Sequence, residues 1–241
     1  MQIIRGDDYQ SWIYSNKDDL VVVDPWLTRK QVFPTFNWLL HRDSTKTPYL
    51  LKYNLVKKVT HIIITAHFSD HLDEESLKFF NKNIPIYTTH EASNTLLKLG
   101  FTNINVVTPN KTYELNSFTI KIFKAGKPYN TTTFSYLLSD SRSKIFHEPH
   151  MFNEKIEFDS VDACIVTVDM VKVLGLVQVS MDLNQAKLAQ AQLNARYLIP
   201  TGIAPKQTRG LISFLLRIKE SYKQMNLIPS SCSQVGDSLS L

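Results

Sequence analysis

The sequence predicts an α/β fold in four layers, an α/β/β/α sandwich in which two mixed β-sheets lie face to face with helices outside. Two observations predict it: short runs of branched apolar residues alternate with helical patterns, and this order of strands and helices occurs twice along the 241 residues. We expect one domain at 1–228, built from halves at about 1–126 and 127–228. The serine-rich stretch at 229–241 is expected to be a loose tail.

The first half of the chain carries the patterns of doubly buried strands and of two helices. Branched apolar residues occupy successive positions in LVVVDP (20–25) and THIIITA (60–66), as expected for strands covered on both faces. The second helix has Thr88 and Glu91 at capping-box spacing and Gly100 at its C-terminal end. The other expected elements are strands at 11–15, 85–89 and 104–109, helices at 73–80 and 90–100, and a hairpin at 113–125 that turns near Asn116 and Ser117.

The second half repeats this order of strands and helices. A hairpin at 134–149 is followed by the buried strand DACIVTV (162–168), the helix NQAKLAQAQLNA (184–195) and the strand RYLIPT (196–201). A last helix is expected from an apolar stripe whose members are four, three, four and three residues apart: Leu211, Leu215, Ile218, Tyr222 and Met225.

Composition and charge argue against several classes of protein. The net charge of +5 comes from lysines dispersed along the chain, which is typical of a solvated surface and not of a nucleic-acid interface. Arg5, Asp7 and Asp8 stand where a signal peptide needs an apolar run, and no stretch approaches the roughly 20 apolar residues of a membrane span. Cys164 and Cys232 cannot form a disulfide framework. We expect a cytoplasmic monomer or homodimer with a small-molecule substrate and no membrane partner. A nucleic-acid partner is the weakest alternative, because it needs a continuous basic face.

The stretch ITAHFSDHLD (64–73) gathers two histidines and two aspartates directly after a buried strand. It resembles the motif Thr-His-x-His-x-Asp-His of the metallo-β-lactamase superfamily, which stands at this point of that fold and is often followed by Leu-Asp. Five residues fall in register: Thr65, Asp70, His71, Leu72 and Asp73. The places of the two leading histidines are taken by Ala66 and Phe68, and His67 lies between them.

The resemblance covers most of the chain. VVVDPWL is similar to an early strand of that fold that ends in an aspartate, here Asp24, and RYLIPT is similar to the strand whose end usually bears the last histidine, here Thr201. KIFHEPH (144–150) resembles the Glu-Pro-His feature of a divergent cyanobacterial and plant subgroup with a degenerate first motif. That subgroup is described as hydrolase-like.

The resemblance implies a reduced metal site. The family's dinuclear site uses about seven protein ligands, and neither an alanine methyl nor a phenyl ring can bind zinc. A mononuclear site remains complete on paper, with Asp70, His71, Glu148 and His150 around one zinc or iron ion, because mixed imidazole and carboxylate ligands do not select strongly between these metals. On this interpretation a metal-bound water attacks an ester, amide or phosphoester, and Asp70 is the catalytic residue.

Other residues are expected in supporting places. Asp24 is expected to hydrogen-bond the motif loop, and Thr201 to lie at the pocket as a poor substitute for the last ligand. His67 is either a pocket residue or a buried, hydrogen-bonded histidine. His147 alternates with Glu148 along its strand and is expected to face elsewhere. The alternative function is a metal-free binding or scaffold protein that retains the fold, which the loss of three ligands favours.

Overall fold

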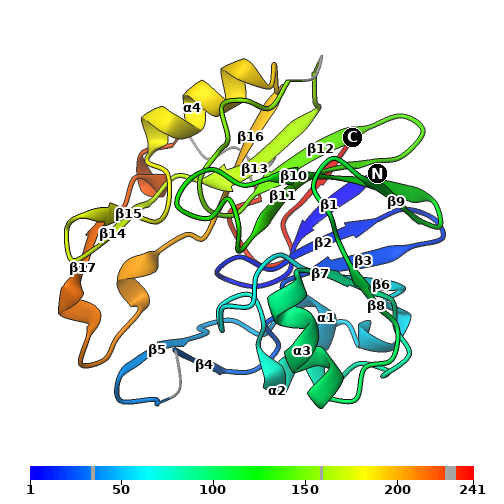
Figure 1. Cartoon of the computed structure of the whole chain (residues 1–241), viewed down its shortest axis with the longest axis horizontal. Helices are drawn as coiled ribbons and strands as arrows, with labels where there is room; N and C mark the ends of the chain where they lie inside the picture. The colour runs from blue at the N-terminus through cyan, green and yellow to red at the C-terminus, as the bar shows by residue number, and fades with distance from the viewer. Residues whose placement is uncertain (34–35, 158–159, 226–231) are drawn as a thin grey trace.

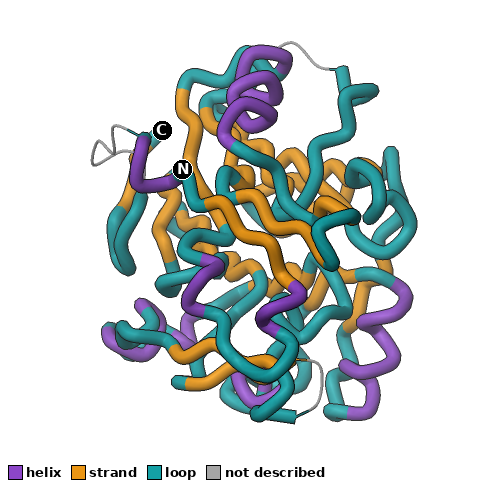
Figure 2. Tube along the Cα trace, turned by 90° about the vertical axis from the view of Figure 1, so that its left-hand side faces the viewer, coloured by secondary structure: helices purple, strands orange, loops and turns teal. Residues whose placement is uncertain are grey.

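The structure is a computed structural model that describes residues 1–33, 36–157, 160–225 and 232–241. Two large β-sheets lie between helices at opposite ends of the molecule (Figures 1 and 2), which confirms the predicted fold class. One end carries α1 (Tyr49–Lys52), α2 (Glu74–Leu77) and α3 (His90–Lys98), and the other carries α4 (Leu183–Gln192). In the part of the chain that the structure describes, no helix has both the length and the apolar composition needed to cross a membrane.

The first large sheet has its strands in the order β18-β1-β2-β3-β6-β7-β8. Its N-terminal strands pair antiparallel, whereas β3, β6, β7 and β8 run parallel to one another. The strands are β1 (Gln2–Arg5), β2 (Trp12–Ser15), β3 (Leu20–Val23), β6 (His61–Ile64), β7 (Ile86–Thr88), β8 (Ile104–Val106) and β18 (Ser238–Ser240).

The second large sheet repeats this design with the order β16-β13-β12-β11-β10-β9. Its antiparallel meander continues into a parallel part formed by β12, β13 and β16. Parallel strands end at the same edge of a sheet, so both sheets deliver the loops after their parallel strands to one region. The strands are β9 (Thr112–Leu115), β10 (Phe118–Lys124), β11 (Phe134–Ser139), β12 (Lys144–Glu148), β13 (Ala163–Thr167) and β16 (Tyr197–Thr201).

Two small sheets lie beside this edge. A hairpin is formed by β4 (Lys30–Phe33) and β5 (Leu40–Asp43), and a three-stranded sheet by β14 (Met170–Val173), β15 (Val177–Gln178) and β17 (Leu216–Lys219). Short 3₁₀ helices occur at η1 (Val56–Lys58), η2 (Pro205–Gln207), η3 (Ser213–Leu215) and η4 (Tyr222–Gln224).

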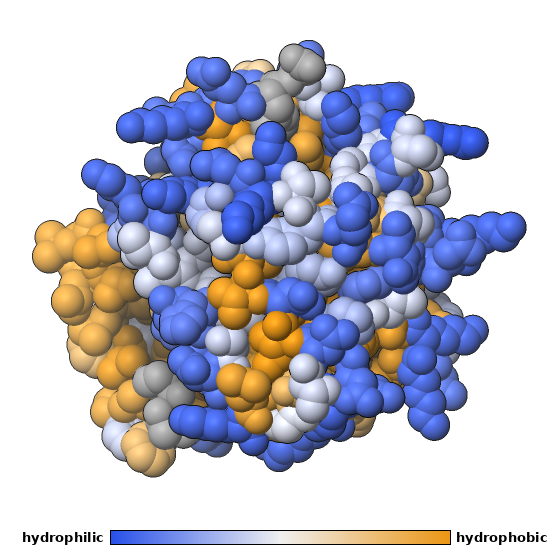
Figure 3. All heavy atoms as spheres, turned by 45° about the vertical axis from the view of Figure 1, so that its right-hand side comes forward, coloured by the Kyte–Doolittle hydropathy of each residue, from blue (hydrophilic) through white to orange (hydrophobic). Residues whose placement is uncertain are grey.

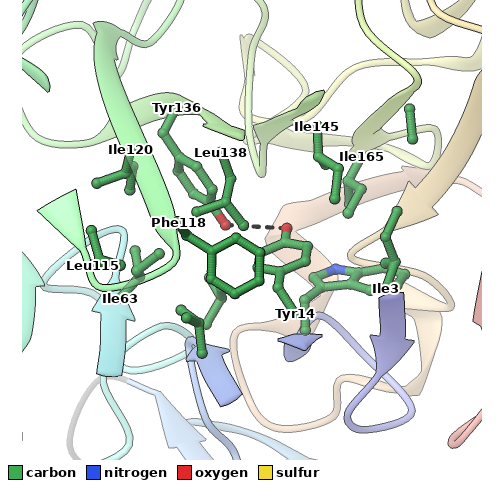
Figure 4. Packing of buried hydrophobic residues seen from close by; sticks show 14 of the residues in the cluster. Ile3, Tyr14, Ile63, Leu115, Phe118, Ile120, Tyr136, Leu138, Ile145 and Ile165 are labelled. Carbon is green, nitrogen blue, oxygen red and sulfur yellow. Dashed lines mark hydrogen bonds between the residues drawn. The ribbon is translucent and has the colours of Figure 1, made fainter. Parts of the chain in front are cut away.

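The inner faces of the two large sheets meet in a core of apolar and aromatic side chains (Figure 4). Phe118, Ile165, Tyr14 and Tyr136 are fully buried there. Burial of a side chain of this size contributes about 1.5–3 kcal/mol, so this contact between the sheets makes a large contribution to the stability of the domain. The hydroxyls of Tyr14 and Tyr136 lie 3.2 Å apart, which places a polar pair within this core.

The prediction of a last helix over the stripe from Leu211 to Met225 is wrong. The segment that carries the apolar stripe instead forms η3, β17 and η4, and Leu211 is 60% exposed. Strand β17 pairs antiparallel with β14, and its side chains alternate between half-buried Leu216 and Ile218 and exposed Arg217 and Lys219. This long-range pairing outweighs the local helical spacing of the apolar residues.

Two smaller expectations also need correction. The segment expected as a loose tail ends in β18, which pairs antiparallel with β1, although residues 229–231 lie outside the described residues. The N-cap of α3 is Thr89 and not Thr88: its hydroxyl accepts a hydrogen bond from the amide of Ala92. Gly100 has a φ of +84° after this helix, consistent with the expected C-terminal glycine.

Helix α4 begins with a complete capping box that yields a stability prediction. Asp182 Oδ1 accepts the amide of Gln185 at 2.9 Å, and Gln185 Oε1 accepts the amide of Asp182 at 2.9 Å. Asp182→Ala is expected to lower the free energy of unfolding by about 1 kcal/mol because the first turn loses an acceptor. Urea unfolding measures this, with the exposed Asn184→Ala as control, which is expected to stay within about 0.5 kcal/mol of the parent. Equal losses in both variants would contradict a specific role of the cap.

Candidate functional site

The centre of the site is a hydrogen-bonded connection between the loops that follow β3 and β6. Asp24, directly after β3, has a φ of +44° and is 1% exposed. Its Oδ1 accepts the amide of Thr65 at 2.8 Å, and its Oδ2 accepts the Thr65 hydroxyl at 2.6 Å and His71 Nδ1 at 2.7 Å. An ionised carboxylate can only accept, so His71 Nδ1 carries a proton in this contact. Asp24 therefore fixes the orientation and the tautomer of His71.

The other nitrogen of His71 faces Asp70. His71 Nε2 lies 3.6 Å from Asp70 Oδ2, and the Asp70 side chain is 25% exposed whereas that of His71 is buried. Burial disfavours the charged imidazolium, but the charges of Asp70 and Asp24 outweigh burial and raise the pKa of His71 to about 8. Asp24, His71 and Asp70 thus form a row of acid, base and acid that runs from the buried Asp24 to the partly exposed Asp70.

The end of β12 and the loop after it bring a second acid and a second imidazole to the same place. Glu148 is fully buried, and its Oε1 accepts the amide of His150 at 2.9 Å. Burial raises the pKa of Glu148 to about 8, although the amide of His150 and the charge of His71 act in the opposite direction. The rings of His150 and His71 lie 4.6 Å apart between centroids, so Glu148-Pro149-His150 reaches the Asp70–His71 pair.

His150 is buried in an aromatic setting. Its ring centroid lies 4.2 Å from that of Tyr129 and 6.2 Å from that of Phe68. Its Nδ1 lies 4.0 Å from Glu148 Oε1 and has no hydrogen-bond partner among the described residues. Burial and the charge of His71 hold the pKa of His150 well below its usual range, so this imidazole is neutral.

His147 points away from the site into the core between the sheets. Its Nδ1 lies 2.7 Å from the Tyr136 hydroxyl and 3.1 Å from the Tyr14 hydroxyl. Burial, reinforced by the charges of His71 and Arg5, lowers the pKa of His147 to about 3. The sequence indicated the direction of this side chain by alternation along the strand but not its tyrosine partners, which come from β2 and β11.

A cavity of about 550 Å³ opens in front of these residues. Its walls include His67, Phe68, Asp70, His71 and His150 from the two loops described above. Sequence reasoning missed most of the rest of the wall, because those residues come from separate elements without a common motif. The missed residues include Tyr9, Tyr129, Val171, Leu216 and Ile218.

The remaining expected site residues lie in different surroundings. His67 is exposed on the cavity wall, with its ring 4.4 Å from that of Phe68, so it is not a buried histidine. Thr201 is fully buried, and its hydroxyl accepts a hydrogen bond from Trp12 Nε1 at 2.9 Å. It joins the two sheets and is not among the cavity-lining residues, whereas the next residue, Gly202, is. Ala66 is buried and forms a β-bridge with Thr133.

The histidine and carboxylate side chains at the site are of types that bind zinc or iron, but their arrangement in space does not form a metal site. His71 has the usual disposition of a ligand, with Nδ1 held by a carboxylate and Nε2 turned outward, and buried His150 Nδ1 lacks a partner. Within the described ranges, however, no three or more His, Cys, Asp or Glu side chains gather so that they could hold a metal ion. The acids and imidazoles stand as two neighbouring pairs, Asp70 with His71 and Glu148 with His150.

Comparison with known proteins agrees with this fold. The family model described as the beta-lactamase superfamily domain matches residues 7–202. An isothiocyanate hydrolase from Delia radicum gut bacteria is 13% identical, with a TM-score of 0.73 over 100% of this chain and 99% of that one. A possible metal-dependent hydrolase from Veillonella parvula is 14% identical, with a TM-score of 0.65 over 88% of each chain. A metallo hydrolase from Ignicoccus hospitalis is 16% identical, with a TM-score of 0.62 over 84% and 83%. These likenesses establish the fold alone, and no curated protein matches the sequence.

Proposed function

Because this chain belongs to the metallo-β-lactamase superfamily, we propose that it is a hydrolase-like protein with a single reactive centre at His71, acting on a small ester, amide or phosphoester. The observation that carries this proposal is the chain of Asp24, His71 and Asp70, which ends in the cavity. Positioned acids and bases of this kind accelerate proton transfer by about 10²–10⁴-fold.

Asp70 and His71 divide the proton transfers between them. Asp70, the more exposed acid, holds the attacking water and takes its proton, and the oxygen of that water bonds to the carbonyl or phosphoryl centre. His71 is charged below its pKa of about 8 and gives the Nε2 proton to the leaving oxygen or nitrogen. Asp24 keeps the imidazolium in place and stabilises its charge.

The cavity indicates the kind of substrate. Its volume of about 550 Å³ is in the usual range for small-molecule sites. Phe33, Val171, Leu216 and Ile218 make one wall apolar, and aromatic rings surround the reactive pair. We therefore propose a substrate with an apolar portion of modest size next to the hydrolysed bond.

The proposed site binds at most one metal ion. The superfamily pattern is degenerate here because Ala66 and Phe68 stand in the places of the two leading histidines. Solved structures of this fold include proteins described as a possible metal-dependent hydrolase and as a diiron beta-hydroxylase. For this chain we propose at most one zinc or iron ion, which Asp70 and His71 would hold with His150 and Glu148 beside them. Because the described side chains do not gather as a metal site, the proton transfers above do not depend on an ion.

The test is metal content combined with turnover. Elemental mass spectrometry of protein purified without chelator is compared between the parent and Asp70→Ala/His71→Ala, and p-nitrophenyl esters and phosphoesters are screened. We expect turnover to fall at least 100-fold in the double variant, because both proton-transfer groups are lost. Asp18→Ala/His90→Ala removes the same residue types from exposed positions and is expected to change nothing. Equal turnover in both double variants would exclude the proposed centre.

The second candidate is a non-catalytic binding protein, and the Phe68 side chain favours it. In place of a metal ligand, this residue adds an aromatic ring to the cavity wall, 5.9 Å from the ring of Tyr129. A protein without turnover whose melting temperature rises with apolar small molecules, and rises less in Phe68→Ala, would support this candidate over the hydrolase.

A further inference from the structure

A hydrophobic surface covers the β14–β15 turn and the segment before β17, at the edge marked by these strands in Figure 1. We define the apolar tip as Leu174, Leu176, Val177, Leu211 and Phe214, which are between 50% and 81% exposed. Figure 3 shows hydrophobic side chains gathered on this side of the molecule, at the left of the view. Contiguous exposed apolar surface of this kind marks an interaction site in a folded protein.

Backbone hydrogen bonds join three separate segments into this surface. The amide of Leu174 donates to the carbonyl of Leu215 at 2.7 Å, and the amide of Leu211 donates to the carbonyl of Trp38 at 2.9 Å. Trp38 is 61% exposed and stacks on Phe36, with ring centroids 6.0 Å apart. The tip is therefore part of the folded structure, and an exposed tryptophan borders it.

The small sheet behind the tip carries cations on its outer face. Lys172 pairs directly with Arg217, and Lys219 lies two residues further along the same face of β17. Among the ion pairs of the described residues, none involves these three cations. Like charges directly opposite each other destabilise a sheet, so this face is suited to an anionic partner from outside the chain.

The opposite face of the same sheet is already occupied. Val171 and Ile218 pair across β14 and β17 and line the cavity, as does Leu216. Successive side chains of a strand point to opposite faces of the sheet, so Lys172, Arg217 and Lys219 take no part in the cavity wall. The cationic face and the apolar tip are a separate surface that the proposed hydrolytic centre does not use.

We propose that the apolar tip and the adjoining cationic face dock on an anionic lipid surface. Exposed aliphatic and aromatic side chains enter the boundary between headgroups and acyl chains, and neighbouring lysines and arginines bind anionic headgroups. A second copy of this chain fits less well, because a two-fold contact centred here would bring the cations of both copies together. The sequence led us to expect no membrane partner because it lacks a span, but surface docking requires none.

Binding to vesicles tests this directly. Sedimentation is compared for vesicles of phosphatidylcholine alone and of phosphatidylcholine with phosphatidylserine, and binding is expected only to the anionic vesicles and to weaken with salt. Trp12 and Trp26 are buried, so a blue shift of the tryptophan emission on binding reports Trp38 and is expected to be absent in Trp38→Phe. Lys172→Gln/Arg217→Gln/Lys219→Gln is expected to weaken binding by roughly 100-fold, because each cation near an anionic surface contributes about fivefold.

Matched variants separate this surface from general charge and hydrophobicity. Leu176→Ser/Phe214→Ser is expected to abolish binding. Leu97→Ser/Leu188→Ser alters two other exposed leucines, on α3 and α4, and is expected to leave binding unchanged. Lys57→Gln/Lys98→Gln/Lys111→Gln is the charge control. Binding to neither vesicle, or equal losses in the control variants, would overturn the proposal. So would a dimer in light scattering that Leu176→Ser/Phe214→Ser dissociates and that does not bind vesicles, because the face would then join two copies.

Discussion

Asp24→Asn is expected to lower the pKa of His71 from its value of about 8 and to reduce turnover at the proposed centre on the order of 10²–10⁴-fold. The charge of Asp24 and its hydrogen bond to His71 Nδ1 both favour the charged imidazolium. In the variant an amide donor faces Nδ1 where a carboxylate oxygen accepted, so the neutral ring with its proton on Nε2 becomes the favoured form. His71 then has no extra proton to give to the leaving group.

Nuclear magnetic resonance of the histidine ring nitrogens measures this change without any substrate. The signal of His71 is expected to titrate near 8 in the parent and at lower pH in Asp24→Asn, with the neutral tautomer reversed. Asp18→Asn serves as control, since that carboxylate is exposed at the surface. An unchanged titration of His71 in Asp24→Asn would mean that Asp24 does not set its protonation.

Asp24→Ala separates the stabilising role of this residue from its electrostatic role. The alanine leaves the Thr65 amide without its buried acceptor, and the Thr65 hydroxyl and His71 Nδ1, which lie 2.8 Å apart, keep only each other as partners. The free energy of unfolding is expected to fall by about 3–5 kcal/mol, as when one partner of a buried pair is removed. Asparagine keeps an acceptor for the Thr65 amide and tolerates the φ of +44°. The free energy of unfolding of Asp24→Asn is therefore expected to fall less than that of Asp24→Ala. Urea unfolding of the two variants makes the comparison.

The fold was largely predictable because its strands are doubly buried. The runs at 20–23, 62–64 and 163–166 are apolar on successive residues, as expected for short strands covered on both faces. The elements that were missed depend on partners distant in sequence. Strand β17 exists because β14 pairs with it, and β18 exists because β1 presents an open edge. No local pattern in either segment specifies such a partner.

The residues themselves predicted the site only where they are adjacent in sequence, whereas the hydrogen bonds of Asp24 to the motif loop were expected from the family resemblance. Asp70 with His71, and Glu148 with His150, were identified from two short stretches that follow buried strands. Their approach to one another was expected only from the family resemblance, because the distance between two loops depends on how the two sheets pack. Thr201 shows the same limit: the strand end was located correctly, but the hydrogen bond from Trp12 that engages its hydroxyl is a contact between the sheets.

His147 is expected to make the domain sensitive to acid. The folded state holds it neutral with a pKa of about 3, whereas in the unfolded chain the ordinary value is about 6.5. Between these values the unfolded chain binds one proton that the folded protein does not, so the free energy of unfolding falls as the pH is lowered. The contribution is about 1.4 kcal/mol for each pH unit below 6.5, and it is absent above that value.

Urea unfolding of the parent and His147→Gln at pH 7.5 and pH 5 isolates this contribution from that of other groups. At pH 7.5 the variant is expected to be less stable by about 1–3 kcal/mol, because Tyr14 and Tyr136 lose their buried partner. At pH 5 the free energy of unfolding of the parent is also lowered by proton binding to His147 in the unfolded chain. The difference in stability between parent and variant is therefore expected to shrink by about 2 kcal/mol. A difference that stays constant with pH would show that the folded protein accommodates a charged His147. The two tyrosine hydroxyls would then have to act as acceptors toward an imidazolium inside the apolar core between the sheets.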